Sequence, residues 1–331
     1  MTPAHIVAPD DERRHPPDAD DLWNESYYAD FVRADGTLGG WIRLGLYPNR
    51  QVAWWTTWIV GPDRPGVCSV NYHLPVPAGD ALVVQEGPTR IELELVRPLQ
   101  EFRIVASAPA QILERPEDAY GDGSGAEVEL GIDLSWTTDG TPYHYDVTTR
   151  YEIPCTVTGT VSIGGVPFAV QGQGQRDHSW GVRDWWAFGW CWSSARLDDG
   201  TRVHLVDIRM PGFPVALGYV QAPDGAAGAP FRVRSITGLS VSEDVGPHGL
   251  PRSARILVAA GTGDDGSPVQ NLAIDVTPIA FGPVLLRNDD DGRISRFPRA
   301  MVRYGLDDGR MGMGWIEWNQ PDPAAPSAGP V

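Results

Sequence analysis

The stretch TGTVSIGGVPFAVQGQ, residues 158–173, decides the fold class of this chain. Two strand-like runs, 158–163 and 166–173, flank the pair Gly164-Gly165. A two-residue hairpin turn needs positive φ angles, and glycine adopts these without steric cost. We therefore predict a β-hairpin here.

Strand signals of the same kind recur on both sides of this hairpin. Residues 185–197 and 201–209 flank the turn sequence Asp198-Asp199-Gly200 and predict a second hairpin. No 11-residue window shows a sustained helical period. The chain has Gly 38, Pro 30 and Trp 13, a composition that favours turns and strands. Further strands are predicted at 38–47, 52–60, 67–74, 90–96, 102–106, 127–136, 215–221, 231–240, 254–260, 269–276, 294–304 and 310–318.

The length of 331 residues exceeds one ordinary domain and predicts two compact units or one large β-barrel or sandwich. We expect an N-terminal β-domain at 21–165 and a C-terminal β-domain at 166–320. The segments 1–20 and 321–331, which are rich in Asp and Pro or in Pro and Ala, are expected to be disordered.

Charge and cysteine usage exclude several classes of function. The net charge is −17 and all 26 cationic residues are Arg, so nucleic acid is an unfavourable partner and lysine-based chemistry is absent. No apolar run approaches the length of a membrane span, and the N-terminus lacks a signal core, so we expect a cytoplasmic protein. Cys68, Cys155 and Cys191 suggest neither a disulfide framework nor a zinc cage.

The sequence GQGQRDHSWGVRDWW at residues 172–186 is the part of the chain richest in side chains that can act in catalysis or bind a ligand. In a strand, Arg176 and His178 face one way, whereas Asp177 and Ser179 face the other. These residues can form a pocket in which carboxylate, imidazole and indole groups converge. They can equally form a structural ionic network with tryptophans filling a domain interface.

The run Arg176-Asp177-His178-Ser179-Trp180-Gly181 resembles the Asp-His-x-Trp signature of carotenoid 1,2-hydratase-like (hydroxyneurosporene synthase-like, AttH-like) proteins. Fungal lipocalin-like Diels-Alderases carry a similar motif. The longer Gly-Gln-Arg-Asp-His-Ser-Trp-Gly form is similar to that of bacterial members without a settled activity. Residues 23–28 and 312–317 also resemble the start and end of that superfamily's two β-domains, so the resemblance extends over most of the chain.

The resemblance implies two lipocalin-like antiparallel β-barrel or sandwich domains packed together, with a hydrophobic ligand pocket near their junction. It also implies that His178, Trp180 and Asp207 act on a terminal alkene. A Tyr of the family motif falls at Leu205, beside His204, which argues against a carotenoid as the substrate.

Hydration of an alkene begins with a strong proton donor, which requires a carboxyl group kept protonated by apolar surroundings. Asp207 stands between Val206 and Ile208 and is our predicted donor. His178 is the predicted water-handling base, and Asp177 the third catalytic candidate. The alternative for Asp207 is an ion pair with Arg209 or Arg196.

The other predicted site residues bind the substrate or position the catalytic groups. Aromatic faces stabilise a carbocation, and Trp180 is the predicted stabiliser. Arg176 and Arg183 are predicted positioning residues, and Glu25 and Glu317 are candidates to reach the pocket from the chain ends. The predicted substrate-binding residues are Trp180, Trp185, Trp186, Trp190, Trp192, Leu205 and His204.

We therefore expect a hydratase or dehydratase, or a cyclase, acting without cofactor or metal on an apolar isoprenoid or polyketide-like substrate. The alternative is a lipocalin-like carrier or sensor that binds a hydrophobic small molecule unchanged. A sugar-binding β-sandwich ranks below both, because the tryptophans lie in apolar runs. The sequence does not indicate an oligomeric state.

Overall fold

The computed structural model describes residues 7–121, 123–223, 231–261 and 270–322. Antiparallel strands dominate this part of the chain, which confirms the predicted all-β class. The short elements between the strands are 3-10 helices. They lie at Pro9–Glu12, Pro48–Arg50, Pro116–Tyr120 and Pro247–Gly249.

The first sheet has 11 strands in the order β4-β3-β2-β1-β11-β10-β8-β7-β6-β5, with β9 paired to β10. A short additional pairing of β4 with β7 joins distant parts of this path and closes a barrel. Its strands are β1 Trp23–Arg33, β2 Gly39–Tyr47, β3 Val52–Val60, β4 Gly66–Pro75, β5 Val83–Glu86, β6 Thr89–Arg97, β7 Glu101–Leu113, β8 Ala126–Thr138, β9 Tyr143–His144, β10 Arg150–Ile163 and β11 Val166–Val182.

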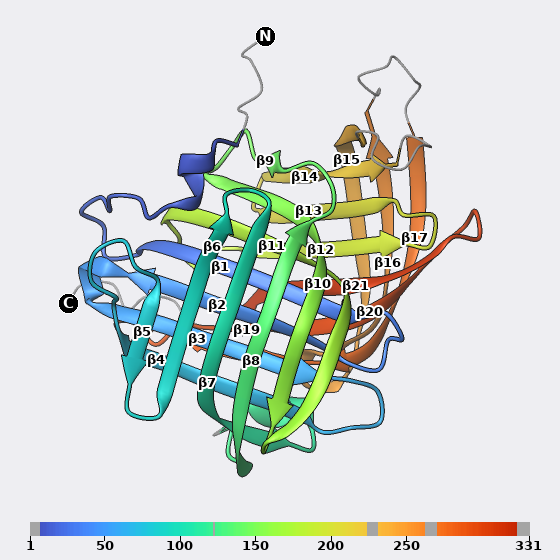
Figure 1. The fold of residues 1–331 in the computed structure, drawn as a ribbon. Helices are drawn as coiled ribbons and strands as arrows, with labels where there is room; N and C mark the ends of the chain where they lie inside the picture. Colours follow the sequence, from blue (N-terminus) through green and yellow to red (C-terminus); the bar gives the residue numbers. More distant parts are fainter. Residues whose placement is uncertain (1–6, 122, 224–230, 262–269, 323–331) are drawn as a thin grey trace, which may run out of the picture.

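The second sheet has 10 strands in the order β12-β13-β14-β15-β16-β17-β20-β21-β19-β18, and β12 also pairs with β21. That pairing closes an antiparallel barrel (Figure 1). Its strands are β12 Gly189–Leu197, β13 Arg202–Met210, β14 Phe213–Ala222, β15 Arg232–Val245, β16 Pro251–Ala260, β17 Gln270–Phe281, β18 Val284–Arg287, β19 Ile294–Phe297, β20 Arg299–Leu306 and β21 Met311–Pro321.

Both predicted hairpins are present. β10 and β11 pair up to Ile163 and Val166, and Gly164 and Gly165 have φ values of 57° and 80°. β11 extends past the predicted end of its strand and pairs with both β10 and β1 in the first sheet. The chain passes to the second sheet after Val182, at residues 183–188. The domain boundary at 165/166 remains a prediction.

The N-terminal segment was predicted to be disordered, but its described residues, 7–20, contact the first barrel. Glu12 is 0% exposed, forms an ion pair with Arg176 and accepts a hydrogen bond from the Tyr151 hydroxyl at 3.1 Å. A buried carboxylate is stable only when it is paired in this way. Glu12 therefore ties the segment to the first barrel.

Three packed cores show how the barrels meet. One core comes from the first sheet and the segment before it, and another from the second sheet. A third core combines Tyr28 and Trp41 of the first sheet with Trp192, Val206 and Trp315 of the second. Figure 1 shows the blue-to-green strands of the first barrel beside the yellow-to-red strands of the second. The outer faces of the two barrels thus form a buried junction.

In the described part of the chain, no helix is long and apolar enough to cross a membrane.

Candidate active site

A cavity of about 520 Å³ lies at the junction and is lined by both barrels. This is the size range of small-molecule binding sites. From the first barrel and the segment after it, the lining residues are Asn24, Ser26, Tyr28, Arg43, Tyr145, Val147, Thr148, Arg150, Asp177, Ser179, Trp180, Gly181, Val182, Arg183, Asp184, Trp185 and Phe188. From the second barrel they are Trp190, Trp192, Val206, Ile208, Met210, Phe213, Val215, Arg299 and Glu317.

Apolar side chains mark the opening of this junction cavity. Val147, Val182 and Phe213 line it and are 61%, 51% and 67% exposed. Exposed apolar groups that border a concave site are typical of ligand-binding surfaces. These three side chains therefore offer an apolar ligand contacts at the solvent side of the cavity.

Asp177 is the buried carboxyl group at the wall of the cavity. It comes from β11, and strand alternation turns it to the outer face of the first barrel together with Ser179, as the sequence predicted. Its Oδ2 accepts a hydrogen bond from Arg150 Nη2 at 2.6 Å. Burial raises the pKa of Asp177 to about 7, against the opposing effect of Arg150. A proton is therefore held here near neutral pH.

Glu152 lies behind Asp177 and is the centre of a buried hydrogen-bond network. Its Oε1 accepts bonds from Arg150 Nε at 2.8 Å and Trp192 Nε1 at 3.1 Å. Its Oε2 accepts a bond from Gln175 Nε2 at 2.7 Å. Although burial opposes ionisation, Arg150 and these donors together lower the pKa of Glu152. The pKa values of these two neighbouring groups are thus shifted in opposite directions: that of Asp177 is raised and that of Glu152 is lowered.

His204 and Tyr145 extend this network across the junction. Burial lowers the pKa of His204 to about 4, so its imidazole is neutral. The Ser193 carbonyl is 3.0 Å from Nδ1, and we assign the ring proton to that nitrogen. The Tyr145 hydroxyl lies 2.5 Å from Nε2 and 3.0 Å from Glu152 Oε1, so its single proton is shared between these two acceptors. His204 therefore orients Tyr145, which lines the cavity, and does not itself line it.

Tryptophans supply much of the aromatic wall. Trp190 donates its indole N–H to Glu317 Oε1 at 2.8 Å, and Trp192 donates to Glu152. Trp185 donates to the Tyr47 hydroxyl at 2.8 Å. Because carboxylates accept the N–H groups of Trp190 and Trp192, these two rings are enriched in negative charge and suit a positive centre.

Asp207, our predicted proton donor, is not part of this cavity. Its chain neighbours Val206 and Ile208 line the wall, so alternation turns Asp207 to the opposite face of β13. There its Oδ2 accepts a hydrogen bond from Arg209 Nε at 2.9 Å, the ion pair weighed as the alternative. The structure therefore corrects the prediction for Asp207.

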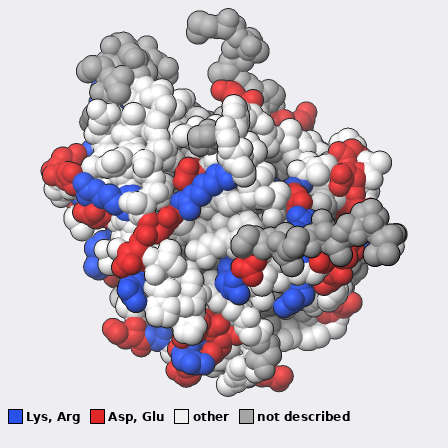
Figure 2. Space-filling model, turned by 180° about the vertical axis from the view of Figure 1, so that it is seen from behind, with Lys and Arg blue, Asp and Glu red and all other residues white. Residues whose placement is uncertain are grey.

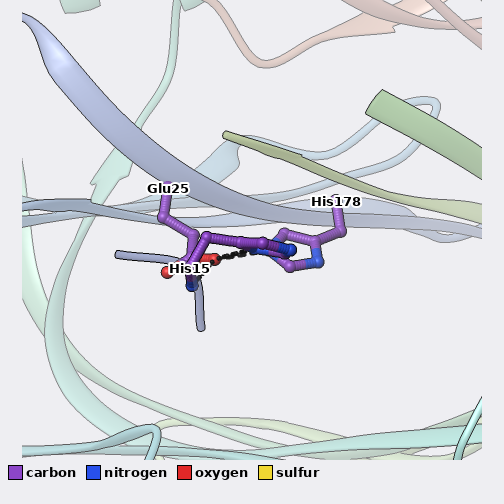
Figure 3. A group of neighbouring side chains, drawn as sticks. All are labelled: His15, Glu25 and His178. Atoms are coloured by element: carbon purple, nitrogen blue, oxygen red, sulfur yellow. Dashed lines mark hydrogen bonds and ion pairs between the residues drawn. The ribbon is translucent and has the colours of Figure 1, made fainter. Parts of the chain in front are cut away.

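His178 also lies away from the cavity, on the inner face of the first barrel. Figure 3 shows it with His15 and Glu25: the Glu25 Oε1 is 3.1 Å from His178 Nε2 and 2.8 Å from His15 Nδ1. Burial lowers the pKa of His178. Arg176 lies on the same inner face and pairs with Glu12. His178 therefore cannot act on a ligand in the junction cavity from this position.

His15, Glu25 and His178 also form a group that could hold a metal ion. Their ligand atoms lie within 4.8 Å of one another. One oxygen of Glu25 already bonds both imidazoles, so the group satisfies its own polar atoms. This arrangement suits an anchor for the N-terminal segment at least as well as a metal site.

The remaining predicted binding residues divide between cavity and core. Trp180 borders the cavity, but its ring stacks on His15 at 3.7 Å. Trp186 packs in a separate cluster and donates to the Leu286 carbonyl. Leu205 lies in the core of the second barrel. The structure thus removes Trp186 and Leu205 from the predicted lining.

Sequence reasoning missed three of the four arginines that line the cavity, and it also missed Tyr145. Arg43, Arg150, Arg299 and Tyr145 come from four separate strands or loops, and no motif joined them to residues 172–186. Glu317 was named as a chain-end candidate and does line the cavity. Arg43 alone offers a local signal, because it is the one charged residue in the otherwise uncharged strand Gly39–Tyr47.

Comparisons with solved structures identify proteins of similar fold. A structure of an AttH candidate from Nitrosomonas europaea matches with a TM-score of 0.64 and 16% identity, covering 96% of this chain and 98% of its own. Kievitone hydratase from Nectria haematococca matches at 0.60 and 9% identity over 97% and 94% of the two chains. CghA matches at 0.53 and 11% identity over 93% of each. The chain therefore shares the lipocalin-like fold of these proteins.

Two comparisons of sequence were also made with known proteins and families. No curated protein matches the chain. The family described as "Domain of unknown function (DUF7064)" matches residues 8–322.

Proposed function

This chain belongs to the DUF7064 family, and we propose that it is a hydratase or dehydratase, or a cyclase, that acts on an apolar isoprenoid or polyketide-like molecule in the junction cavity. The feature that carries the proposal is a buried carboxyl group, Asp177, in the wall of a tryptophan-rich cavity, where burial raises its pKa to about 7. The similarity in fold to a kievitone hydratase supports it.

Asp177 is the proton donor in the proposed reaction. Its proton adds to one carbon of a substrate alkene, the π electrons form the new C–H bond, and the other carbon becomes a cation. Trp190 and Trp192, whose N–H groups bond carboxylates, stabilise that cation through their ring faces. The acid step needs no group other than those in the wall.

Water completes the hydration. Ser179 lines the cavity near Asp177 and offers a hydroxyl to position the water. The water oxygen bonds the cation, and the proton it loses returns to the Asp177 carboxylate, so the enzyme is restored. Dehydration is the same sequence in reverse. In cyclisation, a second alkene of the same molecule bonds the cation, and the new cation loses a proton to the Asp177 carboxylate.

The test is an isotope assay with the purified protein and a panel of terpenoid alkenes, tertiary alcohols and polyketide-like alkenes in water enriched in heavy oxygen. With the wild-type protein, we expect at least one compound of the panel to incorporate heavy oxygen or to be converted to another isomer. Asp177→Asn should lower the rate by about 10² or more, since it lacks the proton.

Asp207→Asn is the matched control, because this variant removes a carboxyl on the same barrel pair but outside the cavity. It should keep the wild-type rate within about threefold. Loss of rate in Asp207→Asn with retention in Asp177→Asn would contradict the proposal. Recovery of a panel member bound but unchanged would favour a carrier.

A further inference from the structure

The junction cavity carries an excess of positive charge inside a strongly acidic protein. Four arginines line it, namely Arg43, Arg150, Arg183 and Arg299, against three carboxyl groups, Asp177, Asp184 and Glu317. The whole chain has a net charge of −17, and Figure 2 shows acidic and basic groups in small mixed patches on one outer face. The charge of the cavity lining is thus opposite in sign to that of the whole chain.

Two of these arginines are bonded to a carboxyl group and two are not. Arg150 pairs with Asp177, and Arg299 pairs with Glu317. Asp184 pairs with Arg293, which lies outside the lining. No carboxylate of the described residues forms an ion pair with Arg43 or Arg183.

Arg43 is the more deeply buried of the unpaired arginines. Its exposed fraction is 9%, and its Nε and Nη2 have no hydrogen-bond partner among the described residues. It stands opposite Tyr28 in the β1–β2 ladder, on the face that lines the cavity. Burying an unpaired charge is costly, so such a group indicates an anionic partner that binds there.

Arg183 approaches the same point from the chain that follows β11. The guanidinium carbons of Arg43 and Arg183 lie 4.8 Å and 5.1 Å from the ring centroid of Trp185. Burial lowers the pKa of Arg183 to about 10, and the charges of Arg150 and Arg43 add to this effect. An anion bound near these two groups would offset their repulsion.

We propose that Arg43 and Arg183 bind the carboxylate of an otherwise apolar substrate, whose hydrocarbon body contacts the tryptophans of the cavity wall. A carboxylate fits because its two oxygens match the fork of a guanidinium. The exposed apolar residues at the opening suit the hydrocarbon part. This inference deepens the proposed function and rests on it, because only an enzyme has a substrate. Binding of the carboxylate does not itself depend on turnover.

The test compares farnesoic acid with farnesol, which share one hydrocarbon body and differ in the head group. Isothermal titration should show that the wild type binds the acid about tenfold or more tightly than the alcohol, the effect of a charge-assisted hydrogen bond. Arg43→Met and Arg183→Met should each lose most of this preference and keep the affinity for farnesol.

Control variants separate the effect of losing a charge from an effect on folding. Arg103→Met removes an exposed arginine that pairs with Asp133 and should leave both affinities unchanged. Arg43→Lys keeps the charge and should retain part of the preference. Circular dichroism reports whether each variant is folded.

Equal wild-type affinities, no binding of the acid, or a preference that survives in both Met variants would overturn the inference. These outcomes are independent of the isotope assay. If Asp177→Asn abolishes turnover while the acid shows no preference, the proposed function stands and the carboxylate site fails. If the acid is preferred but no panel member is altered, the carboxylate site stands without the enzyme.

Discussion

The chemistry of the junction cavity depends on which face of a strand each carboxyl group occupies. Asp177 and Asp207 both have apolar or aromatic residues nearby in the sequence, yet only Asp177 lines the cavity. Strand alternation correctly separates Asp177 and Ser179 from Arg176 and His178. It does not say which face meets the cavity, because that depends on the partner barrel. For Asp207, apolar chain neighbours indicated the wrong environment, since they face the other way.

Charged neighbours should move the pKa of Asp177 in opposite directions. Glu152 raises this pKa and Arg183 lowers it, so Glu152→Gln should lower it and Arg183→Met should raise it, each by roughly half to one unit. The measurement is a pH titration of ¹³C-labelled Asp carboxyl groups by NMR. Shifts of the same sign in both folded variants would show that the local charges have been misassigned.

At the scale of elements, β11 organises the site because it belongs to the first sheet and ends at the junction. The hairpin at Gly164-Gly165 was predictable, since a two-residue glycine turn has a local signature. The pairing of β11 with β1 was not, because its partner lies about 150 residues away and long-range pairing leaves no local mark. Likewise, the strand predicted from residue 185 begins only at Gly189.

Glycines allow β11 to lie close to β1. A Cβ at Gly174 would lie 1.9 Å from the Asp30 carbonyl oxygen, whereas one at Gly165 would meet nothing within 4 Å. Gly174→Ala should therefore destabilise the protein by about 2 kcal/mol or more, whereas Gly165→Ala should cost only the turn strain of about 1 kcal/mol.

Urea unfolding followed by tryptophan fluorescence measures both variants. If both variants lost the same free energy of unfolding, β11 and β1 would be less tightly packed than the structure shows.

At the scale of the whole molecule, two closed barrels bury polar groups between them. The all-β class and two-barrel plan were predictable from recurring strand signals and from the family resemblance. The ionic network at the junction was not, because its members are scattered over both sheets. Asp30 is one of these buried polar groups, and it accepts hydrogen bonds from Tyr28 and Gln175. Burial disfavours its ionised form and raises its pKa to about 7.

This buried carboxyl group should make stability fall as the pH rises. Between about pH 4 and pH 7 the folded protein holds a proton on Asp30 that the unfolded chain has lost, so unfolding becomes easier. Asp30→Asn cannot ionise. The unfolding free energy of Asp30→Asn relative to the wild type should therefore rise between pH 5 and pH 7, by at most about 1.4 kcal/mol per pH unit.

Asp35→Asn is the control, because Arg33 lowers the pKa of the exposed Asp35 and this carboxyl stays ionised throughout that range. Its difference from the wild type should be constant between pH 5 and pH 7. A constant difference for Asp30→Asn as well would mean that Asp30 ionises normally in the folded protein.

The central claim is that the junction cavity holds Asp177 as an acid near neutral pH, and the most direct measurement is its titration in the wild type. The ¹³C carboxyl signal that is absent from Asp177→Asn identifies the residue. We predict a midpoint near pH 7. A midpoint at or below the ordinary value for Asp, about 4, would contradict the account, because the cavity would then contain a permanent carboxylate and no proton donor.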